Sequence, residues 1–265
     1  MSTQRVAIGI EYDGSAFHGW QVQKNGASIQ QSLADAVSVV ADGPSDITGA
    51  GRTDAGVHAV AQVAHFDTEA ERSRRSWVLG INSNLPRGIN VCWAQPVPGD
   101  FHARFSATAR SYRYLVLNRP VRTALADKRC YLVREPLDEQ RMQEAALHLV
   151  GEHDFSAFRA ASCQSRTANR NVHRISVRRN GPYVAVDITA NAFLHNMVRI
   201  VVGVLVRVGV GNAAVSWPLE LLEGRDRRRS AMTVPPQGLY LTAVDYPDVF
   251  GLPEPPAAPL CGWPA

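Results

Sequence analysis

Cysteine is scarce in this chain of 265 residues, and the four that occur follow no pairing pattern. No two of them form a C-x-x-C pair, and no cysteine–histidine spacing resembles that of a zinc site. These absences argue against a disulfide framework or a zinc-binding protein, and they indicate reduced thiols that pack among other side chains. The cysteines are Cys92, Cys130, Cys163 and Cys261.

Targeting segments and long uninterrupted apolar runs are missing too. The first residues show no positively charged region followed by an apolar segment and a cleavage site. The most apolar segment, 192–210, contains His195, Arg199 and Arg207, and such side chains are unfavourable inside a bilayer. We therefore expect a buried helix there, no membrane association, and a cytoplasmic protein.

Lysine is almost absent, because Lys24 and Lys128 are the only two and arginine supplies the other 26 of 28 basic residues. Arginine suits bidentate phosphate contacts, although a GC-rich genome would give the same bias. The net charge is +4, and the excess lies in residues 116–265, with eighteen basic and fourteen acidic side chains. A balance this mild permits nucleic-acid binding without requiring it.

What is present fits a globular protein, since 45% of the residues are hydrophobic, 20% are charged and the mean hydropathy is -0.15. Alternation predicts strands over the ranges 6–12, 59–66, 89–97, 110–117, 172–179, 183–190 and 239–246. Helical spacing and capping residues predict helices over or near 29–40, 77–85, 138–149, 192–210 and 217–222. Ser28 and Gln31 form the predicted capping box, and Asn180-Gly181 predicts a hairpin turn.

The two halves follow the same order of elements without repeating their sequence. Strands and helices mixed with a hairpin predict an α+β fold, with sheets covered by helices mainly on one face. We expect an N-terminal α/β half at 1–115 and a C-terminal α/β half at 116–246. Six of the sixteen prolines crowd into residues 247–265, so this tail is expected to be extended and outside the core.

The most unusual segment is 49–59, GAGRTDAGVHA. Glycines let the backbone turn sharply or approach a ligand closely, and Asp54 follows Arg52 on a loop that leads into a strand. Catalytic groups are often displayed at such a position. From composition alone, however, an Asx-turn aspartate paired with Arg52 and without chemistry is the favoured interpretation.

Five motifs in order change this interpretation, because together they resemble the tRNA pseudouridine synthase A family. They run from the first predicted strand to the last: 11–21 (EYDGSAFHGWQ), 51–59 (GRTDAGVHA), 105–114 (FSATARSYRY), 193–199 (FLHNMVR) and 237–241 (QGLYL). The match leaves out the proline-rich tail and the region near 225–229. One departure is Ile200, where the family often has asparagine after the Val-Arg pair.

The resemblance implies a pseudouridine synthase fold with two ferredoxin-like halves and an active-site cleft between them. It implies an isomerase that converts uridine to pseudouridine at positions 38, 39 and 40 of the tRNA anticodon stem-loop, without cofactor or metal. The family's catalytic aspartate, tyrosine and arginine match Asp54, Tyr112 and Arg199, and its pocket residue matches Leu239. A homodimer is implied as well.

A carboxylate is suited to the implied reaction. Asp54 either attacks C1′ as a nucleophile or removes a proton from the sugar to give a glycal, and the sequence leaves both routes open. Both need the carboxylate ionised, and a neighbouring cation favours that form. Arg199 is the candidate partner, because an arginine that merely reaches solvent is less expected on so apolar a helix.

Residues around the target base have weaker signals. The alternation of Tyr112 with Tyr114 is typical of a core aromatic, whereas the resemblance implies stacking on the uracil, with Leu239 on the other side. A base in or beside a stem must leave the stack before reaction, and the resemblance implies that Arg52 fills its place. His58 is expected to be a core or loop-end histidine.

Arginines that contact the RNA backbone are expected to hold the substrate, with shape read rather than sequence. Arg174, Arg178 and Arg179 lie on or beside one predicted strand and are the candidates. A denser run at 225–229 is equally consistent with solvated surface. Two other hypotheses remain: a catalytically silent tRNA-binding protein of the same fold, and an aspartate-dependent hydrolase of another phosphorylated substrate.

Overall fold

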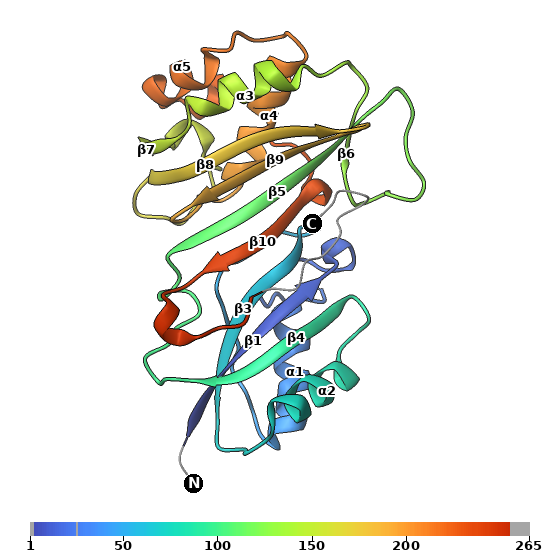
Figure 1. Cartoon of the computed structure of the whole chain (residues 1–265), viewed down its shortest axis with the longest axis vertical. Helices are drawn as coiled ribbons and strands as arrows, with labels where there is room; N and C mark the ends of the chain where they lie inside the picture. Colours follow the sequence, from blue (N-terminus) through green and yellow to red (C-terminus); the bar gives the residue numbers. More distant parts are fainter. Residues whose placement is uncertain (1–2, 25, 255–265) are drawn as a thin grey trace. The chain divides into compact units, whose positions relative to one another are not determined.

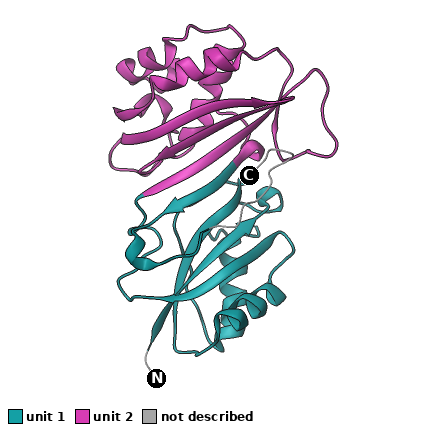
Figure 2. Cartoon of the chain, in the orientation of Figure 1, with its two compact units in different colours: residues 1–108, 240–258 teal, residues 109–239, 259–265 magenta. Residues whose placement is uncertain are grey.

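The computed structural model describes residues 3–24 and 26–254, which form two compact units (Figures 1 and 2). Within the described ranges, unit 1 consists of residues 3–24, 26–108 and 240–254, and unit 2 of residues 109–239. Each unit has strands that pair into a sheet and helices that cover it, so the predicted α+β class is confirmed. The sequence interpretation placed the last strand with the second half, whereas residues 240–254 group with unit 1.

The sheet of unit 1 has the order β4-β1-β3-β10, with the short strand β2 added to β3. Strand β1 is antiparallel to both β3 and β4, and β10 is parallel to β3. The elements are β1 (Gln4–Tyr12), α1 (Ile29–Ala41), β2 (Thr48–Gly49), β3 (His58–Thr68), α2 (Arg74–Asn84), β4 (Ile89–Val97) and β10 (Leu239–Asp245).

The core of unit 1 lies on both faces of β1. On one face Ile8 and Phe66 pack with the helices, and the Phe66 and Trp77 rings meet edge to face at 5.2 Å. On the other face Ala7 and Val63 pack with Phe101. Burial on both faces explains why five consecutive residues of β1 are buried, since each side chain of the alternation has a layer to enter.

The segment after β10 corrects one expectation. The described part of the proline-rich tail does not lie outside the core: Phe250 packs edge to face on Phe101 at 5.1 Å, and Leu252 packs against the same cluster. The apolar residues between the prolines cover the second face of the sheet. The rest of the predicted tail, 255–265, and with it Cys261, falls beyond the described residues.

The sheet of unit 2 has the order β5-β9-β8-β7, with β6 added in parallel to β5. Figure 1 shows α3, α4 and α5 on one side of this sheet. The elements are β5 (Ala109–Asn118), β6 (Tyr131–Val133), α3 (Glu139–Leu147), β7 (Gly151–Asp154), β8 (Asn169–Asn180), β9 (Tyr183–Ala190), α4 (Met197–Gly209) and α5 (Trp217–Gly224). The predicted hairpin between β8 and β9 turns at Gly181, with φ +55°.

Helix α4 is shorter than the predicted 192–210, because it begins only at Met197. Asn191 stops it from starting earlier: its side-chain oxygen accepts from the backbone N–H groups of Ala192 and Asn171, and Asn196 has the left-handed φ of 61°. Ten of the thirteen residues of α4 are buried, as expected for a core helix. Within the described ranges, no helix is long and apolar enough to cross a membrane.

Capping residues act mostly as predicted. Ser28 Oγ accepts from the Gln31 backbone N–H at 3.2 Å, and Asp138 caps α3. The second half of the predicted capping box is wrong, because the Gln31 side chain donates to Asp35 one turn along the helix at 2.8 Å. Side chains four residues apart lie on the same face of a helix, so the Gln31 amide reaches the Asp35 carboxylate.

Candidate active site

Asp54 lies on a short loop of unit 1 that joins β2 to β3. The Val57 backbone N–H donates to the Asp54 carbonyl at 3.1 Å, and Gly56 in this turn has φ +79°, a conformation that favours glycine. Asp54 is half-buried and Arg52 is exposed. The turn thus displays the carboxylate just before β3, on the kind of loop-to-strand position that the sequence predicted.

The backbone on the N-terminal side of Asp54 is fixed by a buried polar network. Thr53 Oγ1 and the Tyr12 hydroxyl lie 2.8 Å apart, and Gln62 Nε2 donates to the Gly51 carbonyl at 2.9 Å. The Trp20 N–H donates to the Thr53 carbonyl at 3.0 Å. Burial raises the pKa of the Tyr12 hydroxyl to about 12, so this group stays neutral. The loop is therefore held in one conformation before substrate binds.

These supporting residues were not among the sequence candidates. The sequence did indicate a role for Tyr12, because this residue ends the apolar alternation of β1. A tyrosine buried there needs a hydrogen-bond partner for its hydroxyl. Gln62 is a polar residue within an otherwise apolar strand, and such a position is occupied only when the amide is hydrogen-bonded. The sequence around Gly19 gave no signal of a supporting role. In the structure Gly19 has φ +91°, and a Cβ there would lie 2.6 Å from the Thr53 carbonyl oxygen.

Tyr112 lies on β5 of unit 2, opposite Ile188 of β9. Its ring is 8% exposed and meets the Phe193 ring edge to face at 5.1 Å. Tyr114, two residues on, is fully buried and donates to the Pro235 carbonyl at 2.7 Å. The two tyrosines of the predicted alternation therefore differ: Tyr114 is a core residue, and Tyr112 retains a small exposed area.

Arg199 lies in the first turn of α4 and is half-buried. Its Nε donates to the Val234 carbonyl at 2.8 Å, and its Nη1 donates to Asn196 Oδ1 at 2.8 Å. These bonds orient the guanidinium within unit 2. A side chain that only extended into solvent would not make them. Arg199 is thus a positioned cation.

Leu239 follows residues 234–238, whose backbone carbonyl groups accept hydrogen bonds from other parts of unit 2. The carbonyls of Val234 and Pro235 accept from Arg199 and Tyr114. Gly238 lets the chain pass close to β5, because a Cβ there would lie 2.7 Å from the Leu115 carbonyl oxygen. Leu239 itself is 6% exposed. Unit 2 therefore links the predicted arginine and the predicted apolar residue through one short segment.

The predicted site residues divide between the units. Asp54 and Arg52 belong to unit 1, and Tyr112, Arg199 and Leu239 belong to unit 2. His58, for which no chemistry was expected, is 1% exposed and stacks on Tyr240 at 4.7 Å. It is a core histidine, as predicted.

The three candidate RNA-binding arginines do not share one face of β8. Arg174 Nε donates to Thr189 at 3.1 Å and Arg178 pairs with Asp187 at 2.8 Å. Arg179 points to the opposite, helix-covered face, where it pairs with Glu139 of α3 at 2.8 Å. The alternation of a strand separates neighbours 178 and 179 and places Arg174 and Arg178 on one face, since the register is regular from Arg174 to Arg178.

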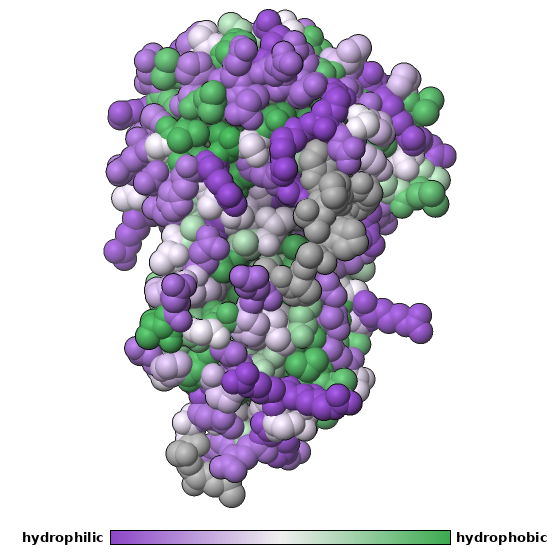
Figure 3. Space-filling view, in the orientation of Figure 1, coloured by the Kyte–Doolittle hydropathy of each residue, from purple (hydrophilic) through white to green (hydrophobic). Residues whose placement is uncertain are grey.

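The arginine run at 225–229 makes contacts within unit 2. Arg225 lies 3.6 Å from Asp154, Arg228 pairs with Asp226 at 2.9 Å, and Arg227 donates to the Ala231 carbonyl. These contacts favour a structural surface for much of the run. On the face shown in Figure 3, hydrophilic and hydrophobic side chains are interspersed over each unit, so hydropathy alone singles out no binding surface there.

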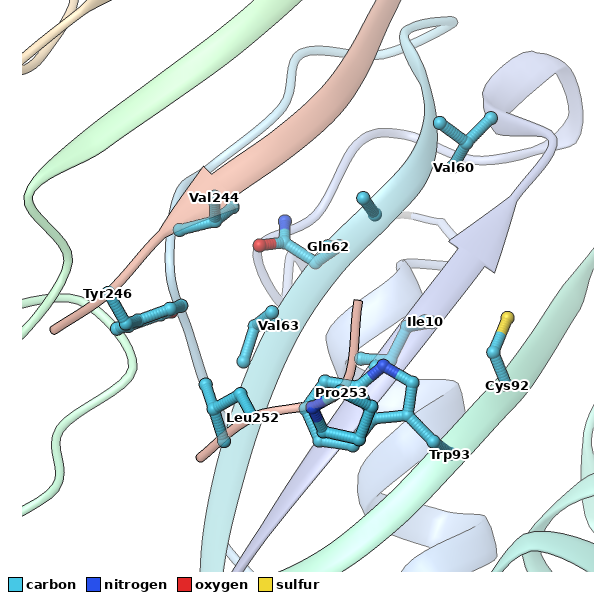
Figure 4. A pocket seen from close by; sticks show the side chains of 12 residues that line it. Ile10, Val60, Gln62, Val63, Cys92, Trp93, Val244, Tyr246, Leu252 and Pro253 are labelled. Atoms are coloured by element: carbon cyan, nitrogen blue, oxygen red, sulfur yellow. The ribbon is translucent and has the colours of Figure 1, made fainter. Parts of the chain in front are cut away.

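One pocket lies in unit 1 and is lined by side chains including Trp93, Val244, Tyr246 and Leu252 (Figure 4). None of the predicted site residues lines it. Within residues 3–24 and 26–254, no group of three or more histidine, cysteine, aspartate or glutamate side chains could hold a metal ion. Cys92, Cys130 and Cys163 are not disulfide-bonded.

Comparison with known proteins identifies the family. The sequence model of the tRNA pseudouridine synthase family matches residues 8–106 and 145–247. Two proteins named tRNA pseudouridine synthase A, from Escherichia fergusonii and Salmonella paratyphi B, are each 55% identical over 256 residues, covering 97% of this chain and 95% of theirs. The chain therefore belongs to the tRNA pseudouridine synthase family, as its motifs predicted.

A solved structure of an H/ACA RNP bound to a substrate RNA containing 2'-deoxyuridine aligns at 14% identity with a TM-score of 0.33, covering 76% of this chain and 44% of the other. This likeness adds nothing to the family assignment.

Proposed function

We propose that this chain isomerises uridine to pseudouridine in the anticodon stem-loop of tRNA, at positions 38, 39 and 40, without a cofactor. The observation that carries the proposal is Asp54, half-buried on a loop whose backbone is fixed at Gly51 and Thr53. This loop contains the Arg-Thr-Asp motif of a family to which the whole chain belongs.

The reaction breaks the N1–C1′ bond, turns the uracil and forms a C5–C1′ bond, while C5 loses a proton and N1 gains one. In one route the Asp54 carboxylate bonds to C1′ and is displaced by C5. In the other it takes a proton from C2′ as the N1–C1′ bond breaks to give the glycal, and it returns the proton to C2′ as C5 bonds to C1′. Both are redox-neutral and consume no water.

The other site residues have proposed roles that follow from their chemistry. The Arg199 guanidinium, oriented by Val234 and Asn196, supplies a positive charge that is complementary to the Asp54 carboxylate. The Tyr112 ring stacks on the uracil and its hydroxyl assists proton transfer, with Leu239 on the other side. Arg52, exposed two residues before Asp54, fills the space that the flipped base leaves.

Release of tritium tests the proposed function. Purified chain and tRNA labelled at uridine C5 are expected to release tritium to water as C5 forms its bond to C1′. A silent tRNA-binding protein would bind without release, and a hydrolase would free uracil with its tritium retained. Either of these two outcomes would contradict the proposal, and mapping the pseudouridine in the product tests positions 38, 39 and 40.

The arginines of β8 give a prediction about RNA binding. Replacing both Arg174 and Arg178 by alanine is expected to weaken tRNA binding and to reduce the slope of log Kd against log salt concentration by about two, since each lost phosphate contact lowers the slope by about one. Titrations of tRNA at several salt concentrations measure this slope.

Two controls separate RNA contact from structural effects. Arg72→Ala removes an exposed arginine paired with Asp42 in unit 1 and is expected to leave the slope unchanged. Arg179→Ala removes the pair with Glu139 and the bond to the Leu137 carbonyl, so it is expected to lower the thermal midpoint instead. An unchanged slope in the double variant would show that Arg174 and Arg178 of β8 do not contact the RNA backbone.

We also propose a homodimer as the working form, which the family resemblance supports, and a cytoplasmic location, which a tRNA substrate supports. Sedimentation of the purified chain tests the dimer.

A further inference from the structure

A loop of unit 1, residues 101–108, exposes an aromatic ring between buried anchors. Phe101 and Ala103 are fully buried, whereas Phe105 is 77% exposed. The loop begins one of the five sequence motifs, but none of the proposed catalytic roles uses Phe105. Among the large hydrophobic side chains that are exposed in the described residues, Phe105 is the only aromatic one.

The loop is held rigid by hydrogen bonds centred on His102. Its Nδ1 accepts from the backbone N–H groups of Arg104 at 3.1 Å and Phe105 at 3.2 Å. Its carbonyl accepts from the Ser106 N–H, and its own N–H donates to Ser106 Oγ, both at 2.9 Å. With its backbone donors satisfied inside the loop, Phe105 has a fixed position.

The loop is also anchored to the sheet of unit 1. The Ala103 N–H donates to His65 Nδ1 at 3.2 Å, and the Tyr246 hydroxyl donates to the Ala103 carbonyl at 2.6 Å. Burial, together with the nearby charges of Arg5 and His102, lowers the pKa of His65 to about 4. His65 is therefore neutral at physiological pH and able to accept this bond.

The surroundings of the Phe105 ring are aromatic and cationic. The His102 ring lies 4.3 Å from it, centroid to centroid, at an interplanar angle of 31°. The Arg104 guanidinium carbon lies 5.6 Å from the ring centroid. The residues beside Phe105 in the chain are Arg104 and Ser106, so the ring is not part of an apolar stretch such as a protein interface would need.

We propose that Phe105, with Arg104 beside it, is a stacking platform for an unpaired nucleobase of the tRNA other than the uridine that reacts. Proteins recognise unpaired RNA bases by stacking on aromatic rings and arginine planes, and a guanidinium next to the ring suits the phosphate of the same nucleotide. The rigid backbone means that little order is lost when the base binds. This inference rests on the proposed function only in taking tRNA as the ligand.

Substitution of Phe105 tests the platform. Phe105→Ala is expected to raise the Kd for tRNA about 5- to 100-fold, the range for loss of one stacked base. Phe105→Trp is expected to keep wild-type affinity, and Phe105→Leu, which is apolar but cannot stack, to bind nearly as weakly as the alanine variant. Val249→Ala, at a residue of unit 1 that is 80% exposed, is the matched control and is expected to bind normally.

The readouts separate this inference from the proposed function and from misfolding. Thermal midpoints are expected to stay at the wild-type value, because the ring is exposed. If the wild type releases tritium and Phe105→Ala binds tRNA as well as wild type does, the platform is refuted while the proposed function stands. If Phe105→Ala instead changes the sedimentation of the chain at unchanged Kd, the ring is a protein contact and the platform is again refuted. Weaker binding in the alanine variant without tritium release by the wild type would support the platform and refute the proposed function.

Discussion

Replacing Asp54 by asparagine is expected to lower the rate of tritium release by at least about a thousandfold, as for other lost nucleophiles. The amide has the shape of the carboxylate, but it can neither bond to C1′ in a displaceable form nor accept a proton from the sugar. The loop is fixed through Thr53, Gly51 and the turn at Gly56. The variant is therefore expected to fold and to bind tRNA with near-normal affinity.

Asp42→Asn is the matched control for this variant. Asp42 is exposed, ends α1 with a left-handed φ of 54° and pairs with Arg72, and asparagine tolerates that backbone conformation. This variant is expected to keep wild-type turnover. Single-turnover tritium release with saturating enzyme separates chemistry from binding. Wild-type rates in the Asp54→Asn variant would show that the reaction does not need the Asp54 carboxylate.

The second large effect is expected from Arg199. Arg199→Met is expected to lower kcat about a hundredfold or more, because the proposed stabilisation of the Asp54 carboxylate by an oriented charge is lost. Arg199→Lys keeps a charge, but it cannot bond to both Val234 and Asn196 as the guanidinium does. It is expected to fall between the methionine variant and the wild type.

The Arg199 variants need a readout that a purely structural role would not change. Arg199→Met is expected to reduce kcat with little change in KM for tRNA. Arg207→Met removes another arginine from α4, whose guanidinium carbon lies 5.1 Å from the centre of the Trp217 ring, and is expected to leave kcat unchanged. A lowered thermal midpoint with normal kcat would make Arg199 only a structural residue.

Much of the fold follows from local sequence patterns. Strands β4 and β9 have the predicted bounds, 89–97 and 183–190, because each alternation is bounded by turn residues. Short strands β2, β6 and β7 were missed, since two to four residues are too few to show an alternation. The late start of α4 depends on bonds between Asn191 and Asn171, and apolar periodicity carries no information about such bonds.

The secondary structure around the candidate site residues was predictable, but the hydrogen bonds that support them were not. Asp54, Tyr112 and Arg199 lie in motifs, and each is found on a loop, strand or helix of the kind expected. The bonds that fix the Asp54 loop come from Tyr12 and Gln62, which are 41 and 11 residues from their loop partners. Arg179 is an example of residues that are close in sequence but separated in the structure. It was grouped with Arg178 because the two are adjacent, yet the strand places their side chains on opposite faces.

Unit 1 is divided between both ends of the chain, so its last strand is synthesised late. Tyr240 of β10 pairs with His58 of β3, four residues beyond Asp54, but the 131 residues of 109–239 are synthesised between the two parts of unit 1. At about 5–20 residues per second, this interval is roughly 7–26 s on the ribosome. The second unit along the chain can therefore close before the first is complete, and a truncated product would be missing a strand from the unit that carries Asp54.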